Sequence, residues 1–179
     1  GLIAGGGLVA GVAWFATWRT NASPGDARSL RAAWIAPVVV AVHPSLAVWA
    51  TGGLETPLFA CLVTWAVCLA AADADAGVWR PASAVLLALA ALTRPEGALL
   101  APLVALLGGS GGRHGGGGRP ALRPILVWLG VFLALWLPYF VWRWTYYGYL
   151  FPNTFYAKVD PGGAEIRRGF AAPQVIELN

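Results

Sequence analysis

Five long apolar segments account for most of this 179-residue chain, and charged side chains are almost confined to the stretches between them. A helix needs about 20 apolar residues to cross the roughly 30 Å hydrocarbon core of a lipid bilayer. Four of the segments approach that length, and the other is interrupted by a charged cluster. The segments cover residues 1–18, 32–50, 54–72, 81–107 and 124–142, of which 81–107 is the interrupted one.

The composition supports burial of these segments in a membrane. Hydrophobic residues make up 58% of the chain and charged residues 11%, against roughly 25% charged residues in a typical soluble domain. Mean hydropathy is +0.65. A soluble core cannot hide so much apolar surface, so we predict an all-α, polytopic transmembrane helix bundle with about five to six segments in the cell membrane. The net charge of +4 lies largely in the connections, so it bears on topology and not on nucleic-acid binding.

Basic residues gather in three of the connections between apolar segments. The positive-inside rule places such connections in the cytoplasm. All three can lie there only if residues 81–107 enter and leave the membrane on the same side, as two short helices joined at 93–97. The basic residues are Arg19, Arg28 and Arg31 in the first connection, Arg80 in the second, and Arg113, Arg119 and Arg123 in the third.

A helical hairpin over residues 81–107 requires that its turn lie within the membrane. Each half has about 13 residues and reaches roughly 20 Å at 1.5 Å per residue, which is too short to cross the bilayer. The turn at residues 94–97 then lies below the membrane surface, where irregular backbone is tolerated only beside a watery cavity. The rival is one continuous helix, which places the Arg-rich stretch 108–123 outside. We favour the hairpin because it keeps all three basic connections on one side.

In this topology three polar clusters share the outer face: residues 51–57, 93–97 and 143–160. In the first cluster, Gly52 and Gly53 can end one helix while Pro57 starts the next. Glu55 is then either a helix-start carboxylate favoured by the macrodipole or a site carboxylate that holds a sugar hydroxyl or a cation.

In the second cluster, Arg94 and Glu96 are separated by a single proline. One interpretation is structural, in which both side chains pair with other helices and hold the bundle together. The other is functional: Arg94 binds a phosphate, for which the guanidinium geometry is suited, and Glu96 orients Arg94 or a substrate hydroxyl.

The third cluster alternates aromatic with polar side chains. Trp and Tyr at a membrane edge usually form an interfacial belt, which explains this cluster's first aromatics better than it explains Pro152-Asn153-Thr154. Aromatic faces with amide and hydroxyl partners also suit sugar rings, and Lys158 can neutralise a phosphate. The candidate binding residues here are Arg143, Tyr146, Tyr147, Asn153, Tyr156 and Lys158.

Three other features have structural interpretations. His43-Pro44 in the second segment predicts a kinked helix in preference to a ligand site. Asp73 and Asp75 are expected to be solvated in a turn, and the two cysteines are expected to pack in a helix. No metal-ligand spacing is present, so no metal or cofactor is expected, although a divalent cation is compatible with the sequence.

The polar clusters occur in a fixed order, separated by apolar segments. They read Gly53-Leu-Glu-Thr-Pro-Leu-Phe59, Leu92-Thr-Arg-Pro-Glu-Gly97, and Tyr146-Tyr-Gly followed by Pro152-Asn-Thr-Phe-Tyr-Ala-Lys158. With this ordered set the chain resembles the integral-membrane glycosyltransferases of the GT-C superfamily from about residue 30 to residue 160. It is most similar to bacterial members of the protein-mannosyltransferase type and to the terminal arabinofuranosyltransferases.

The resemblance implies that a sugar passes from a polyprenyl-phosphate donor to a glycan, lipid or protein acceptor on the extracytoplasmic side. On this hypothesis Glu55 and Glu96 shape the sugar or acceptor pocket. Arg94 and Lys158 hold the lipid phosphate, to which Arg143 adds positive charge. The residues lining the entrance are Tyr146, Tyr147, Asn153 and Tyr156.

The resemblance also implies a catalytic Asp just after the first transmembrane helix. The four Asp residues of the chain, at positions 26, 73, 75 and 160, do not stand in that setting. We therefore expect the base upstream of this sequence, a transmembrane region over 1–160 that is truncated at its N-terminus and inactive alone, and an extracytoplasmic segment from 161. The alternative function is a transporter or flippase for a lipid-linked or small anionic substrate, and a scaffold without chemistry is a third possibility.

Overall fold

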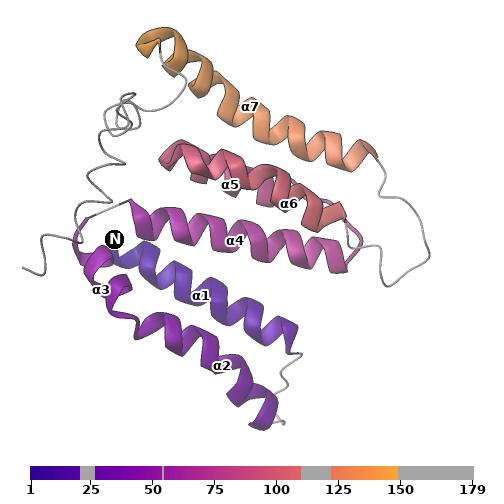
Figure 1. Ribbon diagram of the computed structural model, residues 1–179. Coiled ribbons are helices and arrows are strands. Elements are labelled where there is room, and N and C mark those ends of the chain that lie inside the picture. Colours follow the sequence, from indigo (N-terminus) through magenta and orange to yellow (C-terminus); the bar gives the residue numbers. More distant parts are fainter. Residues whose placement is uncertain (21–26, 54, 110–121, 149–179) are drawn as a thin grey trace, which may run out of the picture. The chain divides into compact units, whose positions relative to one another are not determined.

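The computed structural model describes residues 1–20, 27–53, 55–109 and 122–148, in which every regular element is a helix (Figure 1). A helix satisfies its own backbone hydrogen bonds, so apolar segments can adopt it in apolar surroundings. No strand occurs in these residues, in agreement with the predicted all-α class. In chain order the helices are α1 (Leu2–Arg19), α2 (Ala27–Ala41), α3 (Pro44–Thr51), α4 (Thr56–Asp75), α5 (Ala82–Thr93), the 3₁₀-helix η1 (Pro95–Leu99), α6 (Leu100–Gly109) and α7 (Leu122–Tyr147).

Within this described part, three helices are long and apolar enough to cross a membrane: α1, α4 and α7. The number rises to four if the bent pair α2–α3 forms one span. Two further apolar helices, Ala82–Thr93 and Pro95–Leu106, are shorter. The structure therefore supports membrane helices, whereas the predicted count of five to six segments is not confirmed.

The second apolar segment is bent between α2 and α3, by 51°. Pro44 stands in the first turn of α3, and its ring disfavours a helical backbone at His43. His43 accordingly has an extended conformation, with φ −67° and ψ 120°. The kink predicted at His43-Pro44 is confirmed.

Contacts along the chain define two units, Gly1–Tyr139 and Phe140–Asn179, and the boundary between them falls inside α7. Each unit is described by itself. The domain boundary predicted at residue 160 lies outside the described residues.

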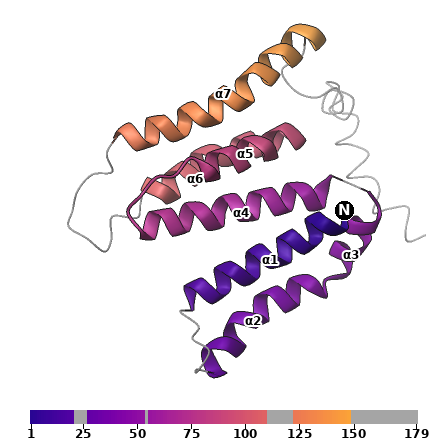
Figure 2. The ribbon, with the colours of Figure 1, turned by 180° about the vertical axis from the view of Figure 1, so that it is seen from behind.

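Glycines on α1 allow this helix to approach α4 closely. A Cβ atom at Gly7 would lie 2.9 Å from Cys61 Sγ, and one at Gly11 would lie 3.0 Å from Trp65 Nε1. The indole N–H of Trp65 donates a 2.9 Å hydrogen bond to the carbonyl of Gly7. Small residues commonly permit such close packing between membrane helices. Because both contact pairs advance together along the chain, α1 and α4 run in the same direction, as Figures 1 and 2 show.

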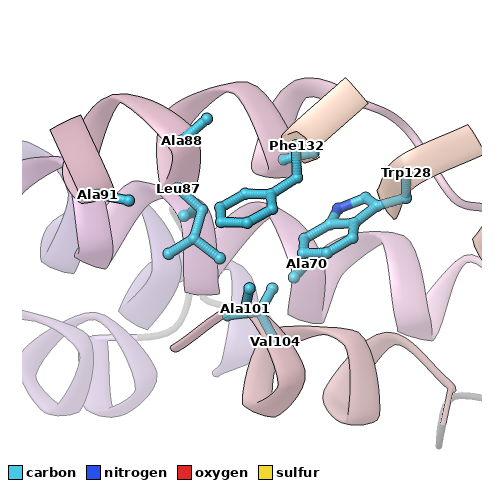
Figure 3. Close-up of a cluster of buried hydrophobic side chains, with 10 residues drawn as sticks. Ala70, Leu87, Ala88, Ala91, Ala101, Val104, Trp128 and Phe132 are labelled. Carbon is cyan, nitrogen blue, oxygen red and sulfur yellow. The ribbon is translucent and has the colours of Figure 1, made fainter. Parts of the chain in front are cut away.

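The main apolar core of the first unit lies among α4, α5, α6 and the first half of α7 (Figure 3). The rings of Trp128 and Phe132 fill it, with 2% and 3% of each residue exposed and their centroids 6.1 Å apart. The indole N–H of Trp128 donates a 2.8 Å hydrogen bond to Ser83 Oγ, which satisfies a polar group in apolar surroundings. The smaller members of the cluster are Ala66, Ala70, Ala84, Leu87, Ala88, Ala91, Ala101 and Val104.

An aspartate holds the turn between α4 and α5. Asp73 is 8% exposed, and its Oδ2 accepts a 3.1 Å hydrogen bond from the backbone N–H of Arg80, whose Nε lies 3.8 Å from Oδ1. The prediction that Asp73 is merely solvated is wrong. Its carboxylate fixes the turn, because it accepts a hydrogen bond from the backbone of Arg80, seven residues later in the chain. Asp75 is exposed and pairs with Arg19 at 2.8 Å, so it too has a protein partner.

The fourth apolar segment is broken where the charged cluster interrupts it. α5 ends at Thr93, Arg94 is extended with φ −142° and ψ 128°, and η1 and α6 follow, so no continuous helix covers 81–107. Ser83 near the start of α5 and Val104 near the end of α6 line one small cavity with Trp128. The chain has therefore turned back, as a hairpin of two short helices.

The first unit consequently has two ends (Figure 1). The Arg94 end is the end that carries Thr51, Glu55 and Arg94, since Arg94 contacts Phe59 in the first turn of α4. The Arg19 end is the opposite end, which carries Arg19, Asp75, Arg80 and Arg123.

The hairpin depends on the absence of a side chain at Gly97. A Cβ atom there would lie 2.7 Å from Ala91 N and 2.9 Å from Ala90 C, both backbone atoms of α5. We expect Gly97→Ala to lower the free energy of unfolding in detergent by about 1–3 kcal/mol, the usual cost of overpacking. Denaturant unfolding followed by circular dichroism measures it. Gly130→Ala is the matched control, because no atom lies within 4 Å of its added methyl group, and an equal effect of the two substitutions would contradict the prediction.

Candidate functional site

Pro95 places Arg94 at the tip of the hairpin. A residue before proline disfavours helical backbone, so α5 ends at Thr93, and the N–H of Arg94 makes the last bond of the helix, 2.9 Å to the carbonyl of Ala90. The N–H of Gly97 then donates to the carbonyl of Arg94 at 2.9 Å. This tight turn projects Arg94 and Glu96 at the Arg94 end.

The guanidinium of Arg94 contacts two neighbours. Its Nη2 lies 3.3 Å from Glu96 Oε1, and the two side chains are 36% and 59% exposed. Its Cζ lies 5.5 Å from the ring centroid of Phe59 on α4, a cation–π contact. Exposed ion pairs contribute little to stability, and a guanidinium has five N–H donors. Arg94 is thus oriented by its neighbours and retains donors for an anionic ligand.

Glu55 precedes the same turn of α4. It is the N-cap residue of α4, its carboxylate makes no capping hydrogen bond, and its side chain is exposed. The N–H of Phe59 donates to the carbonyl of Glu55 at 2.9 Å, so the two residues are one helical turn apart. Gly52 caps α3 and Pro57 starts α4, as the sequence predicts. Phe59 therefore has Glu55 one turn before it on α4, and it contacts Arg94 from the tip of the α5–α6 hairpin.

An apolar groove lies beside the start of α4. Its volume is about 300 Å³, and residues of α1, α2, α3 and α4 line it, with His43 at the helix break. Its polar side chains are those of His43, Ser45 and Thr56; the apolar lining is made mainly by Leu8, Val39, Val40, Leu46, Trp49 and Pro57. In the first turn of α4, Phe59 thus contacts the charged side chain of Arg94, while Thr56 and Pro57 line the apolar groove.

The second unit contains three of the predicted site residues. Arg143, Tyr146 and Tyr147 lie in the last turns of α7. Tyr146 stacks on Trp142 with ring centroids 5.7 Å apart, and its ring meets Tyr147 edge-on at 4.8 Å. Gly148 ends the helix with φ +70°, a conformation that favours glycine. Asn153, Tyr156 and Lys158 lie outside the described residues.

Of the predicted site residues, the structure brings together Arg94 and Glu96, and it places Glu55 one helical turn before Phe59, which contacts Arg94. Sequence reasoning missed Phe59, which links them. The available signal was its spacing: Phe59 stands four residues after Glu55, and residues so spaced lie on one helix face. Sequence reasoning also missed the apolar groove, because its lining comes from four helices.

The side chains gathered here can donate hydrogen bonds to an anion from Arg94 and accept hydrogen bonds at Glu55 and Glu96. Within the described residues, no three His, Cys, Asp or Glu side chains come together to hold a metal ion. Comparison of the chain with protein-family profiles, curated proteins and solved structures finds no match. Fold and site thus define an all-helical protein with helices of membrane-spanning length and a charged hairpin tip.

The contact between Arg94 and Phe59 predicts an energetic coupling. Phe59→Leu keeps an apolar side chain but removes the aromatic face, and Arg94→Gln removes the cation. A double-mutant cycle of unfolding free energies in detergent should give a coupling of about 0.5–1 kcal/mol, the usual size of an exposed cation–π contact. A coupling within error of zero would contradict it.

Proposed function

We propose that this chain belongs to an integral-membrane glycosyltransferase that moves a sugar from a polyprenyl-phosphate donor to an acceptor outside the cytoplasm. Arg94 binds the phosphate of the donor and stabilises the charge left on it as the sugar departs. The sequence assigns Arg143 and Lys158 the same kind of role, as cations that can neutralise a phosphate. Glu55 and Glu96 hold hydroxyl groups of the sugar or of the acceptor. A general base must also deprotonate the acceptor hydroxyl, and none of the residues named here is assigned that role.

The observation that carries this proposal is the surroundings of Arg94. The guanidinium lies 3.3 Å from Glu96 and 5.5 Å from the ring centroid of Phe59, yet the side chain is 36% exposed. An arginine used only to hold helices together would bury its donors against another helix. Bidentate recognition of phosphate is the chemistry that a pre-oriented guanidinium performs best.

The apolar groove supports a donor that carries a lipid chain. It begins at Thr56 and Pro57, in the same helical turn as Phe59, and its lining is almost wholly apolar. A ligand with a charged head and a hydrocarbon tail requires a polar and an apolar surface, and the first turn of α4 contributes residues to both. A water-soluble nucleotide sugar has no use for the groove.

The charge distribution supports the proposed orientation. Arg19, Arg80 and Arg123 belong to the Arg19 end, and the positive-inside rule assigns that end to the cytoplasm. The Arg94 end then faces outward, where polyprenyl-phosphate sugars are used in place of nucleotide sugars.

A transporter or flippase is the second candidate, and one observation favours it. Two segments are broken, α2–α3 with its 51° bend and α5–α6 at Arg94, and pairs of broken helices are typical of secondary transporters. The two candidates differ in covalent chemistry, because a flippase releases its lipid-linked substrate unchanged.

The test is sugar transfer in membranes of cells that produce the protein, with a radiolabelled polyprenyl-phosphate sugar. We expect Arg94→Ala to lower transfer about 10- to 100-fold, since hydrogen bonds to charged groups contribute roughly 1.5–3 kcal/mol. Arg94→Lys should recover part of the loss. Arg123→Ala is the control, because this arginine lies at the Arg19 end.

Two outcomes would contradict the proposal. Wild-type transfer by the double variant Arg94→Ala, Lys158→Ala would exclude the phosphate role of both residues. Movement of intact labelled lipid across proteoliposomes, without any glycosylated product, would establish the flippase instead.

A further inference from the structure

Helix α2 packs on α1 with one face and leaves its opposite face uncovered by the described residues. Ala33 and Pro37, four residues apart, are buried, and α1 is the main contact of this helix. On the other face Trp34, Ile35 and Val38 are 53%, 64% and 52% exposed. In Figures 1 and 2 the helix lies at the edge of the helical array.

The exposed face of α2 contains a second groove. It is shallow and open, because residues of α2 alone line it. Leu30, Arg31, Trp34, Ile35 and Val38 line it, so its floor is apolar and its one charge is at the Arg31 end. The span from Arg31 to Val38 is about 10 Å along the helix axis. The shallow groove therefore follows the helix, with a cation at one end and apolar side chains beyond.

Arg31 has no polar partner among the described residues. Its side chain is exposed, and it makes neither an ion pair nor a hydrogen bond with any described residue. Helix α2 follows α1 after its last residue, Arg19, so Arg31 belongs to the Arg19 end of the unit (Figure 1).

We propose that this groove binds an anionic phospholipid, with the phosphate on Arg31, an acyl chain along Ile35 and Val38, and Trp34 at the level of the headgroup. The charge of Arg31 selects the occupant. An apolar protein surface would leave Arg31 unpaired, and the cation of a zwitterionic headgroup would reduce the attraction between the lipid phosphate and Arg31. Indole rings prefer the headgroup region of a bilayer, and anionic lipids concentrate in the cytoplasmic leaflet. This site is separate from the Arg94 cluster and does not depend on the proposed transfer reaction.

Native mass spectrometry of the purified protein in detergent tests the site. The probes are dioleoyl phosphatidylglycerol and dioleoyl phosphatidylcholine, titrated separately. We expect tighter binding of phosphatidylglycerol, and about a fivefold loss of that affinity in Arg31→Gln, the factor that corresponds to about 1 kcal/mol per basic residue near a lipid surface. Val38→Trp should weaken binding by filling the apolar end of the groove while leaving the charge unchanged.

Arg123→Gln is the matched control, since it removes the same charge from the same end of the unit. Equal losses in Arg31→Gln and Arg123→Gln would overturn the proposal, because they would indicate general attraction and not a site. Unchanged phosphatidylglycerol affinity in Arg31→Gln would overturn it as well. So would a change in oligomeric state without a change in lipid binding, which would assign the face to a second copy of the chain.

Discussion

The chain reverses direction between Thr93 and Leu100, and the close contact of Gly97 with the backbone of α5 makes this reversal possible. With a Cβ atom only 2.7 Å from Ala91 N, any larger residue would push η1 away from the helix it turns against. The reversal decides which end of the unit carries Arg94. It also returns Val104 beside Ser83 and Trp128, where α6 completes the apolar core.

Polar groups in this fold are concentrated at the two ends of the first unit. At the Arg19 end the two carboxylates serve structure, since Asp73 binds the backbone of Arg80 and Asp75 pairs with Arg19. At the Arg94 end the polar groups make fewer hydrogen bonds and ion pairs with the described residues. Arg94 is oriented by Phe59 and Glu96 but keeps donors available, and Glu55 makes no capping bond. The availability of Arg94 and Glu55 is the physical reason to propose the sugar-transfer site at the Arg94 end.

Much of the helical pattern was predictable from sequence, because hydrophobic runs, prolines and glycines act locally. Pro44 and Pro95 mark the two breaks, and both breaks are found. The role of Asp73 was not predictable, since its partner is a backbone group that only the folded turn brings close. The contact of Phe59 with Arg94 depends in the same way on how α5 and η1 dock against α4. Arg94 and Glu96 were identified as a cluster, but their neighbour and the groove beside α4 required the packing of helices far apart in sequence.

The hairpin topology is tested most directly by cysteine labelling on either side of residues 81–107. Val78→Cys lies before α5 and Ser110→Cys after α6, in a background where Cys61 and Cys68 are replaced by alanine. Glu96→Cys marks the tip. With a membrane-impermeant maleimide, intact cells should label Glu96→Cys, whereas Val78→Cys and Ser110→Cys should react only after the cells are opened. Labelling of Val78→Cys and Ser110→Cys from opposite sides of the membrane would contradict the hairpin and, with it, the shared face of the polar clusters.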